Sequence, residues 1–296
     1  MDELKLLEAE GVKCVEDNAP LTISQPQHSR PRQVESLSMG VDNLQGTAAD
    51  GASMNTLSSK QVSVPQITLP DGDKLSQWKY LQNLVFSCPI CNSHTKPGKK
   101  IVFGVGNLDA DIFFCGEAPG EEEEIRGEPF VGRAGQVLTK LIQAMGLQRS
   151  DVYIGNIMNW RPEMPTNYGN RPPTQQEMQL CMPYLMAQLK IVNPKVVIAL
   201  GATAVHGLLG YDPSRRMGDV RGRWFSIGEI PLFITYHPSF ILRSSVHNPM
   251  RTVWEDLMKV MEYLHIPIDN RNLWQNSSEA NAAQQSEQNR SGHHFR

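Results

Sequence analysis

Four short stretches of the chain carry side chains that could do chemistry. Glu117 lies in GEAPG (116–120), Asn156 in GNIMNW (155–160) and His237 in YHPSF (236–240), and GATA occupies 201–204. Carboxylates and imidazoles can move protons or orient a water, and an amide presents a hydrogen-bond donor and an acceptor side by side. These groups are the candidates for a catalytic site.

The loop that follows GEAPG has two features that neither solubility nor core packing explains. Four consecutive glutamates (121–124) precede Phe130, which stands among glycines in GEPFVGRAG. Two interpretations of Phe130 are possible: it contacts a ligand, or it is an ordinary core residue beneath a turn. Glu121, Glu122 and Glu124 are expected to form a solvated face or to lie near a helix N-terminus, where negative charge is favourable.

The apolar pattern predicts the elements that position these stretches. Strands are expected at 110–115, 151–157, 195–201 and 231–238. Helical spacing occurs at 77–87, 133–146, 174–192, 202–210 and 250–264. This alternation predicts a three-layer α/β/α domain with a central, mainly parallel, four-stranded sheet. Ligands of such sheets bind at the carboxyl ends of the strands, where the four stretches fall.

Composition divides the chain into one folded domain, residues 77–267, and two flanks. Residues 1–76 are expected to be flexible and residues 268–296 disordered, because both are poor in apolar periodicity. The formal net charge of −3 does not point to nucleic acid. No apolar run is long enough to span a membrane, and the acidic start lacks a signal-peptide pattern, so a cytoplasmic protein is expected.

Four motifs together resemble a family 4 uracil-DNA glycosylase: GEAPGEEEE with GEPFVGRAG, NI with RP and NRPPT, VIALGATA, and YHPSFILR. They occur in the right order, each at a predicted strand end, and the resemblance covers about residues 84–264. It implies hydrolysis of the N-glycosidic bond of a deoxyuridine flipped out of DNA, which leaves an abasic site in base-excision repair. No lysine falls in these motifs to form a Schiff base, so a monofunctional enzyme is expected.

The resemblance assigns three side chains to the base. Phe130 would stack on the extruded uracil, and Asn156 would pair with its O4 and N3–H. His237 would stabilise the negative charge that builds on O2 as the base leaves. The alternative for Asn156 is a cap of the following loop.

Further roles follow from the same resemblance. Glu117, with the main chain at Ala118, would hold the attacking water, and Glu123 would lie near C5 of the base and exclude the methyl group of thymine. Leu242 and Arg243 resemble an apolar wedge and a phosphate-binding cation that enter the DNA helix. Other possible phosphate contacts, or plain surface charges, are Arg133, Arg161, Arg171, Arg221 and Arg223.

Family 4 enzymes hold a four-iron, four-sulfur cluster on four cysteines, and this chain matches three of the positions. Cys88, Cys91 and Cys181 are the matching residues, whereas Trp160 stands where a cysteine is expected. Three possibilities stay open: a cluster with a non-cysteine or exogenous fourth ligand, a zinc on three thiolates plus another group, or no metal, with Trp160 packed in the cluster's place.

The expected partner is uracil-containing DNA. The protein is expected to be a monomer that does not associate with a membrane. Two other functions remain open from the sequence. One is a catalytically idle DNA-binding homologue, and the other is a glycosylase for other deaminated bases.

Overall fold

The computed structural model describes residues 64–164, 169–244 and 248–268, so most of the two predicted flanks lies outside the described residues. Helix α2 (Lys74–Phe86) begins where the side chain of Asp73 accepts the Ser76 N–H at 2.7 Å. Ile67 and Leu69 already pack against the core ahead of this helix. Ordered packing therefore starts before residue 77, the predicted boundary.

The sheet has six strands in the order β1-β3-β2-β4-β6-β5. Its four central strands pair in parallel and are the four that the sequence predicted; they are β2 (Ile112–Gly116), β3 (Tyr153–Asn156), β4 (Val196–Leu200) and β6 (Ile230–Thr235). Two antiparallel edge strands, β1 (Val105–Gly106) and β5 (Trp224–Ile227), were not predicted. The mainly parallel sheet is confirmed, but it has six strands where the sequence predicted four.

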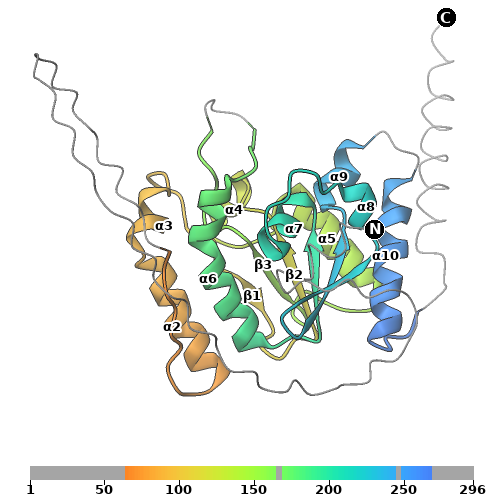
Figure 1. The fold of residues 1–296 in the computed structure, drawn as a ribbon, viewed down its shortest axis with the longest axis horizontal. Coiled ribbons are helices and arrows are strands. Elements are labelled where there is room, and N and C mark those ends of the chain that lie inside the picture. Colours follow the sequence, from red (N-terminus) through yellow and green to blue (C-terminus); the bar gives the residue numbers. More distant parts are fainter. Residues whose placement is uncertain (1–63, 165–168, 245–247, 269–296) are drawn as a thin grey trace, which may run out of the picture. The chain divides into compact units, whose positions relative to one another are not determined.

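Helices cover both faces of the sheet, which confirms the three-layer prediction (Figure 1). Alternate strand residues point to opposite faces. Phe113 and Cys115 share one buried cluster with α2, α6 (Gln175–Val192) and α7 (Ala202–Leu209). Ile112 and Phe114 share the other with α5 (Arg133–Ala144) and α10 (Pro249–Tyr263). The remaining helices are α3 (Pro89–Ser93), α4 (Glu121–Arg126), α8 (Met217–Val220) and α9 (Pro238–Arg243).

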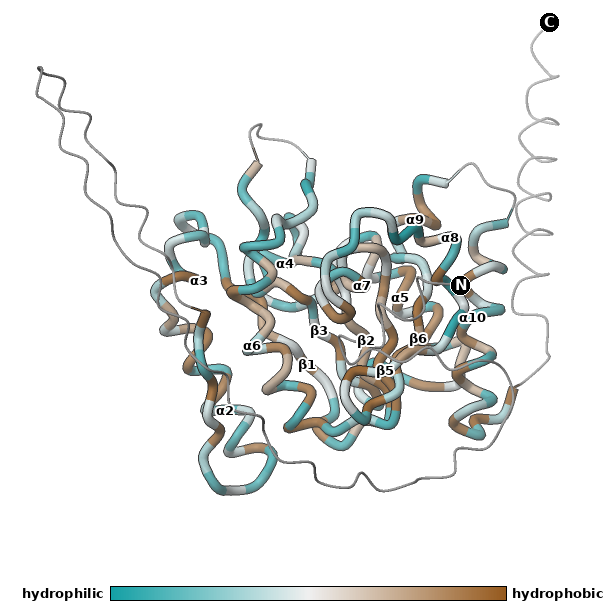
Figure 2. The backbone as a smooth tube through the Cα atoms, in the orientation of Figure 1, coloured by the Kyte–Doolittle hydropathy of each residue, from teal (hydrophilic) through white to brown (hydrophobic). Residues whose placement is uncertain are grey.

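Apolar residues concentrate along the strands, while the connecting loops are largely hydrophilic (Figure 2). This pattern places the polar stretches of interest at the ends of a water-excluding sheet. Within the described ranges, no helix has the length and apolar character that crossing a membrane requires.

Candidate active site

The carboxyl ends of three parallel strands meet at one point. Strand β2 ends at Gly116, which pairs with Asn156 at the end of β3, and His237 follows β6. A Cβ placed on Gly116 would lie 2.6 Å from Phe130 Cε2 and closer still to Asn156 Oδ1, so both side chains lie over this glycine. The rings of Phe130 and His237 lie 5.5 Å apart between centroids. The structure thus brings three predicted site residues together.

Asn156 presents an unused hydrogen-bonding atom to this point. Its side chain is buried, with the residue 7% exposed, and Oδ1 has no partner among the described residues. Leaving a buried acceptor unpaired costs about 1–3 kcal/mol. Such an atom indicates a donor supplied by a ligand, and the neighbouring Phe130 ring favours a flat one.

His237 is held as a neutral hydrogen-bond donor. It caps α9, where its Nδ1 accepts the Ser239 backbone N–H at 3.1 Å and lies 2.8 Å from Ser239 Oγ. An N–H can donate only to an unprotonated ring nitrogen, so the imidazole proton is on Nε2. Burial, with a smaller contribution from the charge of Arg243, lowers the pKa of His237 to about 4. The ring therefore offers Nε2–H without a positive charge.

Leu242 and Arg243 lie on α9, a few residues after His237. Leu242 is 44% exposed, as an apolar wedge would need to be. Arg243 is exposed too, and its Nη2–H donates to Ser239 Oγ at 2.9 Å. Because Ser239 also contacts His237, Arg243 supports the histidine in addition to its predicted role at DNA.

Glu117 follows β2 and is a carboxylate with raised proton affinity. Its Oε2 accepts the hydroxyl of Thr203 at 2.6 Å. Burial raises the pKa of Glu117, and the Thr203 hydrogen bond and the charge of Arg243 oppose this in part. A half-buried carboxylate of this kind suits a general base. Ala118 beside it packs against the sheet core.

Glu123 holds the loop that carries Phe130. Its two carboxylate oxygens accept three backbone N–H groups: Gly120 at 3.1 Å, Val131 at 2.9 Å and Gly132 at 2.8 Å. The sequence predicted Glu123 beside the base. The structure adds an anchoring task, which fixes the turn on which Phe130 sits.

Of the two alternatives predicted for Glu121, Glu122 and Glu124, the position near a helix N-terminus is confirmed, whereas a solvated Glu124 is wrong. The four glutamates form the first turn of α4, and Glu124 faces inward, 4% exposed. Its Oε1 lies 2.9 Å from Arg161 Nη1 and 3.6 Å from Lys99 Nζ. Arg161 also donates to Asn170 Oδ1 at 2.9 Å. The ion pair between Glu124 and Arg161 was not predicted, because a run of four glutamates does not show which one pairs with a cation.

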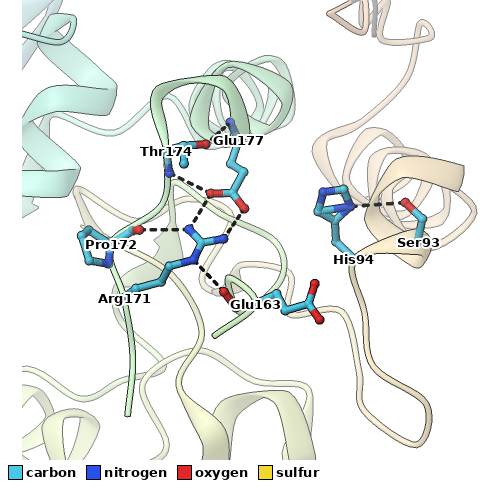
Figure 3. Close-up of polar contacts among 7 residues, drawn as sticks. All are labelled: Ser93, His94, Glu163, Arg171, Pro172, Thr174 and Glu177. Atoms are coloured by element: carbon cyan, nitrogen blue, oxygen red, sulfur yellow. Dashed lines mark hydrogen bonds and ion pairs between the residues drawn. The ribbon is translucent and has the colours of Figure 1, made fainter. Parts of the chain in front are cut away.

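Arg171 is likewise engaged within the protein (Figure 3). Its guanidinium donates to both oxygens of Glu177, at 2.7 and 2.8 Å, and to the backbone carbonyl of Glu163. These contacts lower the pKa of Glu177 to about 2. Glu177 in turn accepts the Thr174 N–H at 2.7 Å, which confirms the predicted capping box of α6.

Three of the five arginines considered for phosphate contact therefore have structural partners. Arg161 and Arg171 are described above, and Arg221 donates to both oxygens of Asp256 at 2.9 Å. Arg133 and Arg223 are exposed and form no ion pair with the described residues. Phosphate contact stays a prediction for all five, and for Arg133 and Arg223 it would break no ion pair that the described residues form.

The three cysteines of the expected cluster site are all buried. Burial, and then the nearby Cys181 and Cys88, raise the pKa of Cys91 far above its usual range. Burial also raises the pKa of Cys181 to about 12. Cys88 differs from the other two: burial disfavours its thiolate, but hydrogen bonds from Tyr184 and Cys91 outweigh burial and lower its pKa. The three sulfur atoms are close enough to influence one another.

The residue at the fourth position does not suit a cluster. Trp160 is 1% exposed, and its ring centroid lies 4.9 Å from that of His94. Within the described ranges, no three His, Cys, Asp or Glu side chains are arranged to hold a metal. The residues present therefore do not fit a four-cysteine cluster.

Three residues that contact the predicted site residues were not predicted from the sequence. Thr203 and Ser239 lie inside the GATA and YHPSF motifs, so their position at a strand end was a usable signal. Arg149 contacts the Phe130 turn from outside every motif, and no pattern in the sequence points to it.

Comparison with known proteins agrees with this fold. Residues 103–258 match the family model of the Uracil DNA glycosylase superfamily. The chain is 40% identical over 183 residues to the type-4 uracil-DNA glycosylase of Thermotoga maritima, covering 61% of this chain and 91% of that protein. The Pyrobaculum aerophilum type-4 enzyme is 38% identical over 169 residues, covering 55% and 83%. The chain belongs to the uracil-DNA glycosylase superfamily, and within it to the type-4 group.

Proposed function

We propose that this chain is a uracil-DNA glycosylase that hydrolyses the bond between uracil N1 and the deoxyribose of a flipped-out nucleotide. The observation that carries the proposal is the meeting of Phe130, Asn156 and His237 over Gly116. The type-4 relatives are named for this activity. Removing the base leaves an abasic site in the DNA.

Phe130 and Asn156 bind the base. Stacking of a base on an aromatic ring contributes about 1–3 kcal/mol, which offsets part of the few kcal/mol that flipping costs. The unpaired Oδ1 of Asn156 accepts N3–H of uracil, and the amide nitrogen donates to O4. Cytosine presents the opposite pattern at both positions, so the same amide orientation rejects it.

His237 and Glu117 act on the bond that breaks. As the N1–C1′ bond cleaves, its electron pair stays with uracil, and the negative charge spreads to O2. The Nε2–H of His237 donates to that oxygen, a contribution of about 3–4 kcal/mol for a donor of this kind. Water attacks C1′ and gives its proton to Glu117, whose raised proton affinity suits the task.

The remaining residues act around this centre. Glu123 anchors the Phe130 turn and in addition closes the space beside C5, where thymine carries its methyl group. Leu242 enters the space that the base leaves, and Arg243 contacts a phosphate. The half-exposed position of Leu242 on α9 supports this arrangement.

We also propose that Trp160 replaces the fourth cluster ligand as a packing residue, and that Cys88, Cys91 and Cys181 stay as buried thiols. The burial of the indole and its contact with His94 support this proposal. Iron and sulfide analysis of anaerobically purified protein should find neither in stoichiometric amount. Stoichiometric iron and sulfide with a visible cluster absorption would refute the replacement.

An oligonucleotide with one uracil tests the function. The protein should release free uracil and leave an abasic site, and should leave matched thymine and cytosine oligonucleotides intact. Binding without an abasic product would instead support a catalytically idle homologue. Faster release of hypoxanthine or xanthine would assign the site to other deaminated bases. Monomeric state and cytoplasmic location remain predictions, and size-exclusion chromatography checks the first.

A further inference from the structure

The turn that carries Phe130 is strained and must be held. Phe130 has φ of 54°, in the left-handed region that residues with a side chain rarely adopt. The first turn of α5 presses against it, because a Cβ on Gly135 would lie 2.7 Å from Phe130 Cα. A backbone in this conformation persists only where surrounding groups fix it.

Arg149 fixes the carbonyl side of this turn. From the loop between α5 and β3, its Nη1 donates to the Phe130 carbonyl at 3.1 Å and its Nη2 to the Pro129 carbonyl at 3.0 Å. Nη1 also lies 3.3 Å from Thr139 Oγ1 on α5. The planar guanidinium presents two donors in a rigid fork, so one side chain holds two successive carbonyls in a set orientation.

Glu123 fixes the amide side of the same turn. Its Oε1 accepts the N–H groups of Val131 and Gly132, the two residues after Phe130. The turn is therefore held by a cation at its carbonyls and by an anion at its amides. Burial lowers the pKa of Arg149, and the charges of Glu128 and then Glu123 oppose this, so both carboxylates favour the charged guanidinium.

We propose that Arg149 is a positioning residue for base removal: it holds the left-handed turn that presents the Phe130 ring to the base. This inference rests on the proposed function. Arg149 acts only through Phe130 and contacts neither the base nor the water. Without its fork, the strained turn relaxes, and the ring leaves its place over Gly116.

A double-mutant cycle tests this coupling. Phe130→Ala and Arg149→Met are each expected to slow single-turnover uracil release by about tenfold to a hundredfold. The double variant should be no slower than Phe130→Ala alone, since Arg149 has nothing left to position. Arg149→Lys, which reaches one carbonyl, should fall between wild type and Arg149→Met. Guanidinium ion should partly restore Arg149→Met and leave Phe130→Ala unchanged.

Lys74 offers a matched control. Its Nζ also donates to two backbone carbonyls, those of Leu108 and Val192, each at 3.0 Å. These carbonyls precede β2 and β4, so they lie at the amino ends of the strands, away from the candidate site. Lys74→Met should lose stability and keep the uracil-release rate, measured well below the melting temperature of each variant.

Two results would overturn the proposal. One is a rate for Arg149→Met no lower than for Lys74→Met, and the other is a double variant slower than Phe130→Ala by the full factor of Arg149→Met. Both results require a wild-type protein that releases uracil, because each variant's rate is compared with the wild-type rate. A wild type that releases no uracil refutes the function itself, so the two failures are distinguishable.

Discussion

Gly116→Ala adds one methyl group at the point where the site residues meet. The backbone of Gly116 does not adopt a positive φ, so alanine fits the strand conformation and the effect is steric. The new Cβ would lie 2.6 Å from Phe130 Cε2, whereas ordinary contacts begin at 3.4 Å. The Phe130 ring, the Asn156 amide or both must move by about 1 Å, a displacement that costs about a hundredfold in rate when it affects reacting geometry.

The assay is single-turnover uracil release, compared with the melting temperature of each variant. Overpacking at one buried position costs about 1–3 kcal/mol, so Gly116→Ala should remain folded. Gly218→Ala is the control, because a Cβ there meets nothing within 4 Å. The control should match wild type in rate. A rate for Gly116→Ala within a few-fold of wild type would show that Phe130 and Asn156 do not meet the base over this glycine.

Three further predictions follow from the same geometry. His237→Ala removes the donor to O2 together with the N-cap of α9, and should lower the rate by about 10²–10³ while the protein stays folded; a near wild-type rate would contradict the role. The rate should be lost as pH falls through the raised pKa of Glu117, because only the ionised carboxylate accepts a proton; a profile flat to pH 4.5 would contradict this. Arg161→Met leaves Glu124 buried without its closest cation and should lower the free energy of unfolding by about 3 kcal/mol, measured in urea; no change would contradict the pairing.

The sequence predicted the parallel centre of the sheet because its strands are long apolar runs. KVVIALG at 195–201, a continuous apolar run between two helical segments, is typical of a buried parallel strand. The edge strands escaped because β1 has two residues and β5 four, too few for a pattern to stand out. Helix α9 was not predicted either, because it has only six residues and its N-cap is His237 in place of the usual Ser, Thr, Asp or Asn.

The site residues at strand ends were predictable because parallel topology brings such ends to one edge. The side-chain contacts that surround these residues were not predictable. Glu124 and Arg161 are far apart in sequence, and their pairing is set by how α4 packs. Arg149 follows α5 in an ordinary polar loop, and its importance depends on where the Phe130 turn lies. Such contacts between distant segments leave no periodicity in the sequence.

In the proposed mechanism, a buried, uncharged imidazole with its proton on Nε2 stabilises the departing uracil. Nitrogen-15 NMR of His237, assigned with a His237→Gln variant, measures this state directly. We expect a protonated Nε2, an unprotonated Nδ1, and no titration until the pH approaches about 4. A ring that titrates near the ordinary value of 6.5, or that carries its neutral-state proton on Nδ1, would contradict it.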